Sequence, residues 1–174
     1  TCALPIFTAT VGELEFTTVY CPNGKSVEHD DYPRKLEWFD ALVDHVREAA
    51  GKARPSILCG DFNICPSALD TWDEDGHAGR IFHTDAERDR MQALYGTGLQ
   101  DAFRALSPDS QAFSWWDYRA GAFQRNHGLR IDFLLANEAA MQSVSAVEID
   151  RDYRKKKGDL KASDHAPVYA DLSL

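Results

Sequence analysis

Two short motifs hold residue types that suit phosphate chemistry. Gly60-Asp61-Phe62-Asn63 follows the apolar run 57–59, and Ser163-Asp164-His165-Ala166-Pro167 precedes a final strand-like segment. Asp61 and Asn63 are two residues apart, and on an extended chain such side chains point the same way. Carboxylate, amide and imidazole groups suit a divalent cation and a phosphate ester. Taken alone, the first motif also fits an Asx-rich turn after a strand.

A third carboxylate, Asp132, lies within the apolar segment 129–135. On a strand, the odd-numbered apolar residues would share one face, and Asp132 would lie on the other face with Arg130. Burying a carboxylate there costs free energy unless the group is paired. Arg130 is one possible partner and His165 is the other. A carboxylate bonded to His165 would fix its tautomer and present the other ring nitrogen to a phosphate or a water.

The hydrophobic pattern predicts a mixture of strands and helices around these motifs. Alternation and short apolar runs predict strands, whereas three- and four-residue spacing predicts helices. The expected strands are 13–20, 56–60, 111–118, 130–135, 144–149 and 166–172, the expected helices are 32–50 and 85–96, and 70–83 is expected to be a polar loop. Because the two types mix without strict alternation, we expect an α/β or α+β layered fold in a single domain.

The composition is that of an ordinary globular domain. The chain has 174 residues, of which 44% are hydrophobic and 27% charged, and it contains no apolar run long enough to span a bilayer. Its four cysteines lack C-x-x-C spacing, so we expect reduced thiols rather than zinc ligands or disulfides. No secretory pattern is present. We expect a cytoplasmic protein that acts as a monomer and does not bind membranes.

Charge is unevenly distributed along the chain. The net charge of −9 argues mildly against a polyanionic partner, but residues 151–161 hold six basic and two acidic residues. Such a run is either a solvated loop or a loop that contacts phosphates beside an active site. Both interpretations stay open at this point.

Five motifs, in order, resemble the exodeoxyribonuclease III family of abasic-site DNA repair nucleases, part of the endonuclease/exonuclease/phosphatase superfamily. They are Tyr-x-Pro-Asn-Gly (20–24), Gly-Asp-x-Asn (60–63), Ser-Trp-Trp-Asp-Tyr-Arg (114–119), Gly-Leu-Arg-Ile-Asp (128–132) and Ser-Asp-His-Ala-Pro (163–167). The resemblance covers residues 7–174. It implies a four-layered α/β sandwich, in which two mixed sheets pack face to face with helices outside and the active site lies at one edge.

The resemblance also implies catalytic roles. Asp61 would orient or deprotonate the attacking water, and Asn63 would hold a phosphate oxygen or a metal-bound oxygen. His165, oriented by Asp132, would contact the scissile phosphate and stabilise negative charge in the transition state. Asp164 would bind or support the metal. The implied cofactor is Mg²⁺ or Mn²⁺, with Asp61, Asn63, Asp164 and His165 as its ligand set.

The remaining implied residues contact DNA. Tyr20 and Asn23 would hydrogen-bond the phosphate, and Tyr20 would assist the leaving oxygen. Trp115 and Leu129 match the family's pocket for a base-less sugar, and Asn126 is a further DNA-binding candidate, although a turn role explains it equally well. The implied substrate is double-stranded DNA with 3′ ends or abasic sites, cleaved by 3′→5′ exonuclease and apurinic/apyrimidinic endonuclease activity.

The start of the chain departs from the family pattern. The family carries an asparagine and a metal-binding glutamate before the Tyr-x-Pro-Asn motif, and only 19 residues precede Tyr20. Residues 1–6 also resemble a translated sequencing adapter. We therefore expect 1–6 to be a non-native leader and 7–174 to be roughly the C-terminal two-thirds of one domain, weakly active or inactive as a fragment. A phosphatase or phosphodiesterase of the same superfamily, acting on other phosphate esters, and a non-catalytic DNA-binding module are the alternatives.

Overall fold

The computed structural model describes residues 6–49, 54–155, 158 and 161–173. Strands and helices alternate irregularly along the chain. The elements are β1 (Ile6–Val11), β2 (Leu14–Tyr20), α1 (Asp31–Ala49), β3 (Ser56–Asp61), η1 (Ala68–Asp70), α2 (Glu74–His77), α3 (Asp85–Tyr95), β4 (Gln100–Asp101), α4 (Ala102–Leu106), α5 (Ala122–Arg125), β5 (Asp132–Ala136), α6 (Glu138–Met141), β6 (Val144–Ile149), η2 (Arg151–Arg154) and β7 (Val168–Leu172), where η marks a 3-10 helix.

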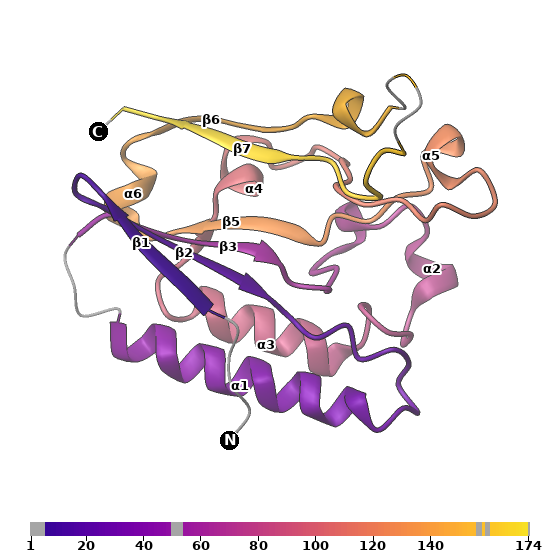
Figure 1. Cartoon of the computed structure of the whole chain (residues 1–174). Coiled ribbons are helices and arrows are strands. Elements are labelled where there is room, and N and C mark those ends of the chain that lie inside the picture. The colour runs from indigo at the N-terminus through magenta and orange to yellow at the C-terminus, as the bar shows by residue number, and fades with distance from the viewer. Residues whose placement is uncertain (1–5, 50–53, 156–157, 159–160, 174) are drawn as a thin grey trace.

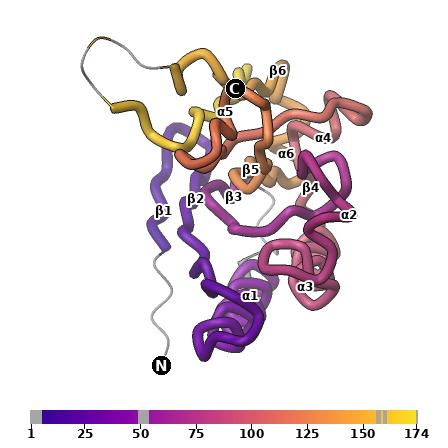
Figure 2. The backbone as a smooth tube through the Cα atoms, turned by 90° about the vertical axis from the view of Figure 1, so that its right-hand side faces the viewer, coloured from indigo at the N-terminus to yellow at the C-terminus, as the bar shows by residue number. Residues whose placement is uncertain are grey.

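Two sheets form the centre of the fold (Figure 1). The larger sheet has five strands in the order β1-β2-β3-β5-β4, and β6 and β7 form a separate antiparallel pair. Strands β2 and β3 are parallel, whereas β1, β5 and β4 run antiparallel to their neighbours. Figures 1 and 2 show α1 and α3 on one face of the larger sheet and the β6-β7 pair on its other face. The expected arrangement of two packed sheets with flanking helices is confirmed.

Helix α1 supplies much of the core on its side of the larger sheet. Its buried residues recur at three- and four-residue spacing, at Lys35, Trp38, Phe39, Leu42 and Val43. The apolar members of this stripe pack with residues of α3 and with the sheet in one cluster. The helix predicted over 32–50 is confirmed over 32–49, and residue 50 and the expected C-cap at residue 51 lie outside the described residues.

A second cluster fills the space between the two sheets. Leu14, Ile57 and Leu134 of the larger sheet pack there with Phe103 of α4 and Val147 of β6. Strand β3 contributes to both clusters, because Ile57 points into one and Leu58 into the other. A strand that is buried on both faces reads as a continuous apolar run, which explains the pattern before Asp61.

Several predicted elements differ from the observed ones. The strand expected over 111–118 is wrong, because this segment makes only single bridges, from Trp115 to Leu129 and to His165. Its large side chains pack into a separate cluster with Ala122 and Ala166 instead of alternating across a sheet. The expected loop 70–83 contains α2, which Asp73 caps by accepting a hydrogen bond from the backbone of Gly76.

Other predictions concern the ends of elements and the termini. Strand β5 begins at Asp132 rather than at residue 130, because the backbone N–H of Arg130 donates to Asp70 instead of to a sheet neighbour. Strand β1 was not predicted, although its apolar residues Phe7, Ala9 and Val11 alternate with two threonines. Of the expected leader, residues 1–5 lie outside the described residues, and Ile6 pairs with Val19 in the sheet.

The remaining whole-chain expectations are consistent with the described part of the chain. Cys21, Cys59 and Cys65 are buried free thiols, and Cys2 lies outside the described residues. Burial raises the pKa of Cys21 and of Cys65, which keeps these thiols protonated. Across residues 6–49, 54–155, 158 and 161–173, no helix combines the length and the apolar character needed to cross a membrane.

Candidate active site

Three strands end together at one edge of the larger sheet. Because β2 and β3 are parallel, their last residues, Tyr20 and Asp61, are register partners. Strand β5 runs the opposite way, so its first residue, Asp132, is the register partner of Asp61. The sheet register therefore places these three residues side by side across three adjacent strands, as the resemblance requires.

His165 is the partner of Asp132. Its Nδ1 atom lies 2.9 Å from Asp132 Oδ2. Two backbone hydrogen bonds, from Trp116 to Asp164 and from Ala166 to Ser114, hold the segment around His165 in place. The question that the sequence left open is thus answered in favour of the histidine.

Arg130, the alternative partner, points elsewhere. Its guanidinium is buried and pairs with the carboxylates of Asp70 and Asp101, both at 2.7 Å. These ion pairs raise the pKa of Arg130 still further despite its burial, so the side chain is a permanently charged structural group. It joins η1 and β4 to the residues that lead into β5.

Ser114 is a site residue that the sequence reasoning missed. Its side chain is buried, and Oγ donates a 2.6 Å hydrogen bond to Asp132 Oδ2. The same oxygen accepts from the backbone N–H groups of Ile131 and Asp132. Ser114 therefore fixes the carboxylate that orients His165. Its only signal in the sequence was its place in the motif 114–119, where the tryptophans drew attention instead.

Asp61 and Asn63 form a tight turn directly after β3. Asn63 has a positive φ of 51°, a conformation that asparagine tolerates better than most residues. The carboxylate of Asp61 accepts hydrogen bonds from the backbone N–H of Asn63 at 2.9 Å and from its Nδ2 at 3.1 Å. Nδ2 of Asn63 also donates to the carbonyl of Cys21, and its Oδ1 accepts a long, 3.4 Å hydrogen bond from Asn23. Asn23 and Asn63 thus meet across two loops.

The electrostatics of the site favour proton-transfer chemistry. Burial, followed by the charge of Asp132, raises the pKa of Asp61 from 3.8 to about 6. Burial alone would lower the pKa of His165, but the hydrogen bond and charge of Asp132, helped by Asp61 and Asp164, raise that pKa above its usual value. A carboxylate poised near neutral pH and an imidazolium stabilised by its neighbours suit a base and a charge stabiliser.

The donor set at this edge fits a divalent cation. Asp61, Asp132 and His165 each offer one ligand atom, and these three atoms all lie within 4.8 Å of one another. Within the part of the chain that the structure describes, no other such group of histidine, cysteine or acidic side chains exists. Two carboxylates this close repel each other, and a cation between them would relieve that repulsion.

The geometry differs from the ligand set that the resemblance implied. Asp132 joins the converging group, whereas Asp164 does not belong to it. The Oδ2 atom of Asp164 instead accepts a hydrogen bond from Trp115 Nε1 at 3.1 Å. Asp61 and His165 belong both to the implied ligand set and to the observed group. Asn63, the fourth implied ligand, is hydrogen-bonded to Asp61.

Three of the expected DNA-contacting residues, Tyr20, Trp115 and Leu129, lie near the ends of the strands that carry Asp61 and Asp132 or beside His165, whereas Asn126 lies at the end of α5. Trp115 and Leu129 pair with each other through the backbone, next to His165, and Tyr20 ends β2 with 57% of its surface exposed. Asn126 is less directly placed, because it caps α5 in a left-handed conformation. Its side-chain oxygen accepts hydrogen bonds from Trp116 and Arg151, so its turn role is clear and its DNA role stays a prediction.

The basic segment is only partly a solvated loop. Arg154 is buried, and its guanidinium lies over the rings of Tyr118 and Phe123. Arg151 lies over Phe123 at 4.2 Å and donates to the carbonyl of the same residue. Residues 156–157 and 159–160 lie outside the described residues, so the phosphate-contacting role stays a prediction.

Comparison with known proteins agrees with this geometry. Residues 3–165 match the model of the Endonuclease/Exonuclease/phosphatase family. The chain belongs to that family.

Curated members of the endonuclease/exonuclease/phosphatase family include similar exodeoxyribonucleases. The chain is 35% identical over 159 residues to the exodeoxyribonuclease of Bacillus subtilis, a match that covers 90% of this chain and 59% of that protein. It is 36% identical over 169 residues to exodeoxyribonuclease III of Haemophilus influenzae, with 92% and 62% covered. The resemblance to exodeoxyribonuclease III is thereby confirmed, and the chain spans about three-fifths of the length of these relatives.

Solved structures from the endonuclease/exonuclease/phosphatase family share the fold closely. The 3′-5′ exonuclease NExo of Neisseria meningitidis superposes with a TM-score of 0.93 at 33% identity, covering 99% of this chain and 70% of that one. A structure of the 3′ phosphatase NExo from Neisseria bound to a product DNA hairpin also gives a TM-score of 0.93, at 32% identity, with 99% and 69% covered.

The expectations that residues 1–6 are not native and that a preceding segment is lacking stay predictions.

Proposed function

We propose that this protein hydrolyses phosphodiester bonds in DNA as a divalent-metal-dependent repair nuclease, with 3′→5′ exonuclease and abasic-site endonuclease activity. The observation that carries the proposal is the convergence of Asp61, Asp132 and His165 at one end of the larger sheet. Membership of the family and the similarity to exodeoxyribonucleases support DNA as the substrate. Because the chain spans less than two thirds of those relatives, the activity of the whole protein belongs to the proposal.

Asp61 would act on the attacking water. Its carboxylate, with a pKa of about 6, is ionised in most molecules above neutral pH and still basic enough to accept a proton. Hydrogen bonds from Asn63 hold the carboxylate in one orientation. To hold an oxygen of the phosphate as well, Asn63 Nδ2 would exchange its hydrogen bond to the carbonyl of Cys21 for one to that oxygen.

His165 would stabilise the negative charge that develops on the phosphate. Nδ1 is bonded to Asp132, which leaves Nε2 to face the substrate. Asp132 is itself held by Ser114, so the imidazole does not have to reorganise when charge develops. Preorganised donors of this kind supply a large share of the rate enhancement in phosphoryl transfer.

Asp61 and Asp132 would hold the cofactor, Mg²⁺ or Mn²⁺, with Asn63 and Asp164 in support, and His165 would lie beside the ion with its ring nitrogens used for Asp132 and the phosphate. When bound, such an ion supplies Lewis-acid stabilisation of charge on a phosphate oxygen and lowers the pKa of water. Carboxylate oxygens are the preferred ligands of both ions. Burial raises the pKa of Asp61 most, repulsion from Asp132 raises it further, and a bound cation would remove that repulsion.

The remaining residues would recognise DNA. Tyr20 and Asn23 lie at the ends of β2 and its following loop, from which they would hydrogen-bond the phosphate. Trp115 and Leu129, paired beside His165, would line the pocket for a base-less sugar. Asn126 would contact DNA through its Nδ2, because its bonds to Trp116 and Arg151 use only its Oδ1.

The test compares cleavage of double-stranded DNA that contains one abasic site, in Mg²⁺ and in EDTA. Asp61→Asn and His165→Asn should each reduce cleavage to near background, and EDTA should do the same to the unsubstituted protein. Asp89→Asn and His45→Asn, which make the same changes at exposed positions of α3 and α1, are matched controls and should retain activity. Cleavage that survives either site substitution would show that the assigned roles are wrong.

A second candidate is removal of phosphate from 3′ ends. One similar structure is described as a 3′ phosphatase bound to a product DNA hairpin. A DNA hairpin with a 3′-phosphate, tested beside the abasic duplex, separates the two activities. An inositol phosphate as a third substrate tests a phosphatase on non-DNA esters, and tight abasic-DNA binding without any hydrolysis would indicate a non-catalytic module.

A further inference from the structure

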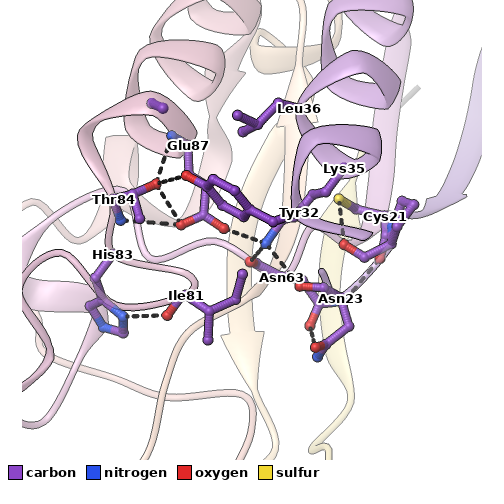
Figure 3. Close-up of polar contacts among 12 residues, drawn as sticks. Cys21, Asn23, Tyr32, Lys35, Leu36, Asn63, Ile81, His83, Thr84 and Glu87 are labelled. Carbon is purple, nitrogen blue, oxygen red and sulfur yellow. Dashed lines mark hydrogen bonds and ion pairs between the residues drawn. The ribbon is translucent and has the colours of Figure 1, made fainter. Parts of the chain in front are cut away.

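A lysine is fully buried beneath the candidate site. Lys35 lies on the buried stripe of α1, and its side chain has 0% exposure. Figure 3 shows its ammonium between Glu87, Asn63 and Asn23. Gly24 lies directly against its stem, because a Cβ on Gly24 would stand 3.0 Å from Lys35 Cδ. The ammonium also lies 4.7 Å from the centre of the Phe82 ring. A charge in such a place is costly, so its partners indicate why it is there.

The ammonium of Lys35 reaches the backbone of two site residues. Nζ donates to the carbonyl of Asn63 at 2.6 Å and to the carbonyl of Asn23 at 3.3 Å. Asn23 follows β2 and Asn63 follows β3, and the Nδ2 of Asn23 donates a hydrogen bond to the Oδ1 of Asn63. One buried cation therefore joins the two loops that present the amides assigned to the phosphate.

The bond to Asn63 has a particular consequence. This residue is in the left-handed conformation, with its N–H bonded to the carboxylate of Asp61. Lys35 holds its C=O from the opposite side. The peptide groups on both sides of Asn63 are thus fixed, and with them the direction of its side chain.

The positive charge of Lys35 is balanced by α3. Glu87, also with 0% exposure, accepts a 2.5 Å hydrogen bond from Nζ through Oε1. Its other oxygen accepts from the backbone and side chain of Thr84 in the capping box that starts α3. Tyr32 of α1 bonds to the Thr84 hydroxyl at 2.7 Å. Both carboxylate oxygens of Glu87 therefore accept hydrogen bonds, which fixes the position of this counterion beside Lys35.

We infer that Lys35 is a positioning residue for phosphodiester hydrolysis: its buried ammonium sets the backbone of Asn23 and Asn63 and thereby holds the Asn23 amide and, through the hydrogen bonds of Asn63, the Asp61 carboxylate in place for the scissile phosphate. The inference rests on the proposed function. A buried ion pair by itself is weak evidence for stability, since well-packed apolar residues often do as well. An apolar side chain at position 35 would fill the space but could not donate to either carbonyl.

The experiment separates positioning from stability with three variants of the full chain. Lys35→Met leaves Glu87 buried without its partner and should lower Tm by about 10 °C. Lys35→Met combined with Glu87→Gln removes both charges and should regain most of that loss. Glu87→Gln alone is the matched control, because it removes the counterion while leaving Lys35 bonded to both carbonyls.

Cleavage is then measured well below every Tm, at saturating DNA. The double variant should keep KM within about threefold but lose about 10- to 100-fold in kcat, because a misplaced phosphate-binding group weakens binding of the transition state most. Glu87→Gln should stay within about threefold of the unsubstituted kcat despite its lower Tm. If the double variant regains kcat together with Tm, or if Glu87→Gln loses as much kcat as Lys35→Met, the network is structural and the inference is wrong.

Hydrogen exchange supplies a readout that does not depend on activity. The amides of Cys21, Asn23, Gly24 and residues 61–64 should exchange faster in the double variant than in Glu87→Gln, with α1 and α3 unchanged. If the unsubstituted protein cleaves no DNA, the proposed function fails, and this comparison alone decides whether Lys35 holds the two loops. Equal exchange in both variants would overturn the inference.

Discussion

The raised pKa of Asp61 makes a testable prediction about stability in the absence of metal. An acid whose folded-state pKa exceeds its unfolded-state pKa binds its proton more tightly in the folded state. Its stabilising contribution is therefore full below about pH 4 and is lost as pH rises through about 6. Asparagine cannot ionise, so Asp61→Asn should remove this loss.

The structure gives the size of the effect. A rise in pKa from 3.8 to about 6 corresponds to about 3 kcal/mol, since one pKa unit is worth about 1.36 kcal/mol. Asparagine still accepts the bond from the backbone N–H of Asn63, but its NH₂ group would lose the bond from Asn63 Nδ2, at a cost of about 1 kcal/mol at every pH. The variant should be about 1 kcal/mol less stable than the unsubstituted protein at pH 4 and about 2 kcal/mol more stable at pH 8.

Urea unfolding in EDTA, followed by fluorescence from pH 4 to pH 8, measures both curves. Asp89→Asn, at an exposed position on α3, corrects for the general loss of one negative charge. Mg²⁺ should then stabilise the unsubstituted protein more than Asp61→Asn, because the variant lacks a charged ligand. Stability curves that run parallel between pH 4 and pH 8 would refute the account of Asp61 given above.

Three further substitutions test other parts of the structure. Ser114→Ala should lower the free energy of unfolding by about 1–3 kcal/mol and slow cleavage, because Asp132 loses a donor and two backbone N–H groups lose their acceptor; urea unfolding and a cleavage assay check both. Asp70→Ala should cost about 3–5 kcal/mol in urea unfolding, since Arg130 stays buried with one of its two carboxylates gone, and a cost below about 1 kcal/mol would contradict this. Trp38→Ala, at a side chain with 1% exposure, should cost about 3–5 kcal/mol, clearly more than Trp72→Ala at 39% exposure, measured as the difference in thermal stability.

Local sequence was sufficient for the elements with a strong repeating pattern. The stripe along α1 predicted its buried face, and the second helix, expected from residue 85, begins there as α3. The strand predicted over 111–118 was wrong, because a run of aromatic residues is compatible both with a strand and with the irregular segment in which these residues pack. Periodicity describes only neighbours within a few residues, so it cannot show which distant surface a side chain will meet.

The buried lysine illustrates the same limit. Lys35 stands on the apolar stripe of α1, four residues before Phe39, and a charged residue at such a position was a signal available in the sequence. Its meaning was not available, because its partners lie 28 residues away in Asn63 and 52 residues away in Glu87. Only the packing of α1 against α3 and the loop after β3 brings them together.

The sequence by itself determined the chemical inventory of this protein and the family that the ordered motifs resemble, because residue types and short spacings are written in the chain. The tertiary structure alone decided the pairings. It joined Asp132 to His165 rather than to Arg130, and it placed Asp61 opposite Asp132. The physical reason is that each pairing depends on strand register and on the burial of charge, and both are set by contacts between segments far apart in the sequence.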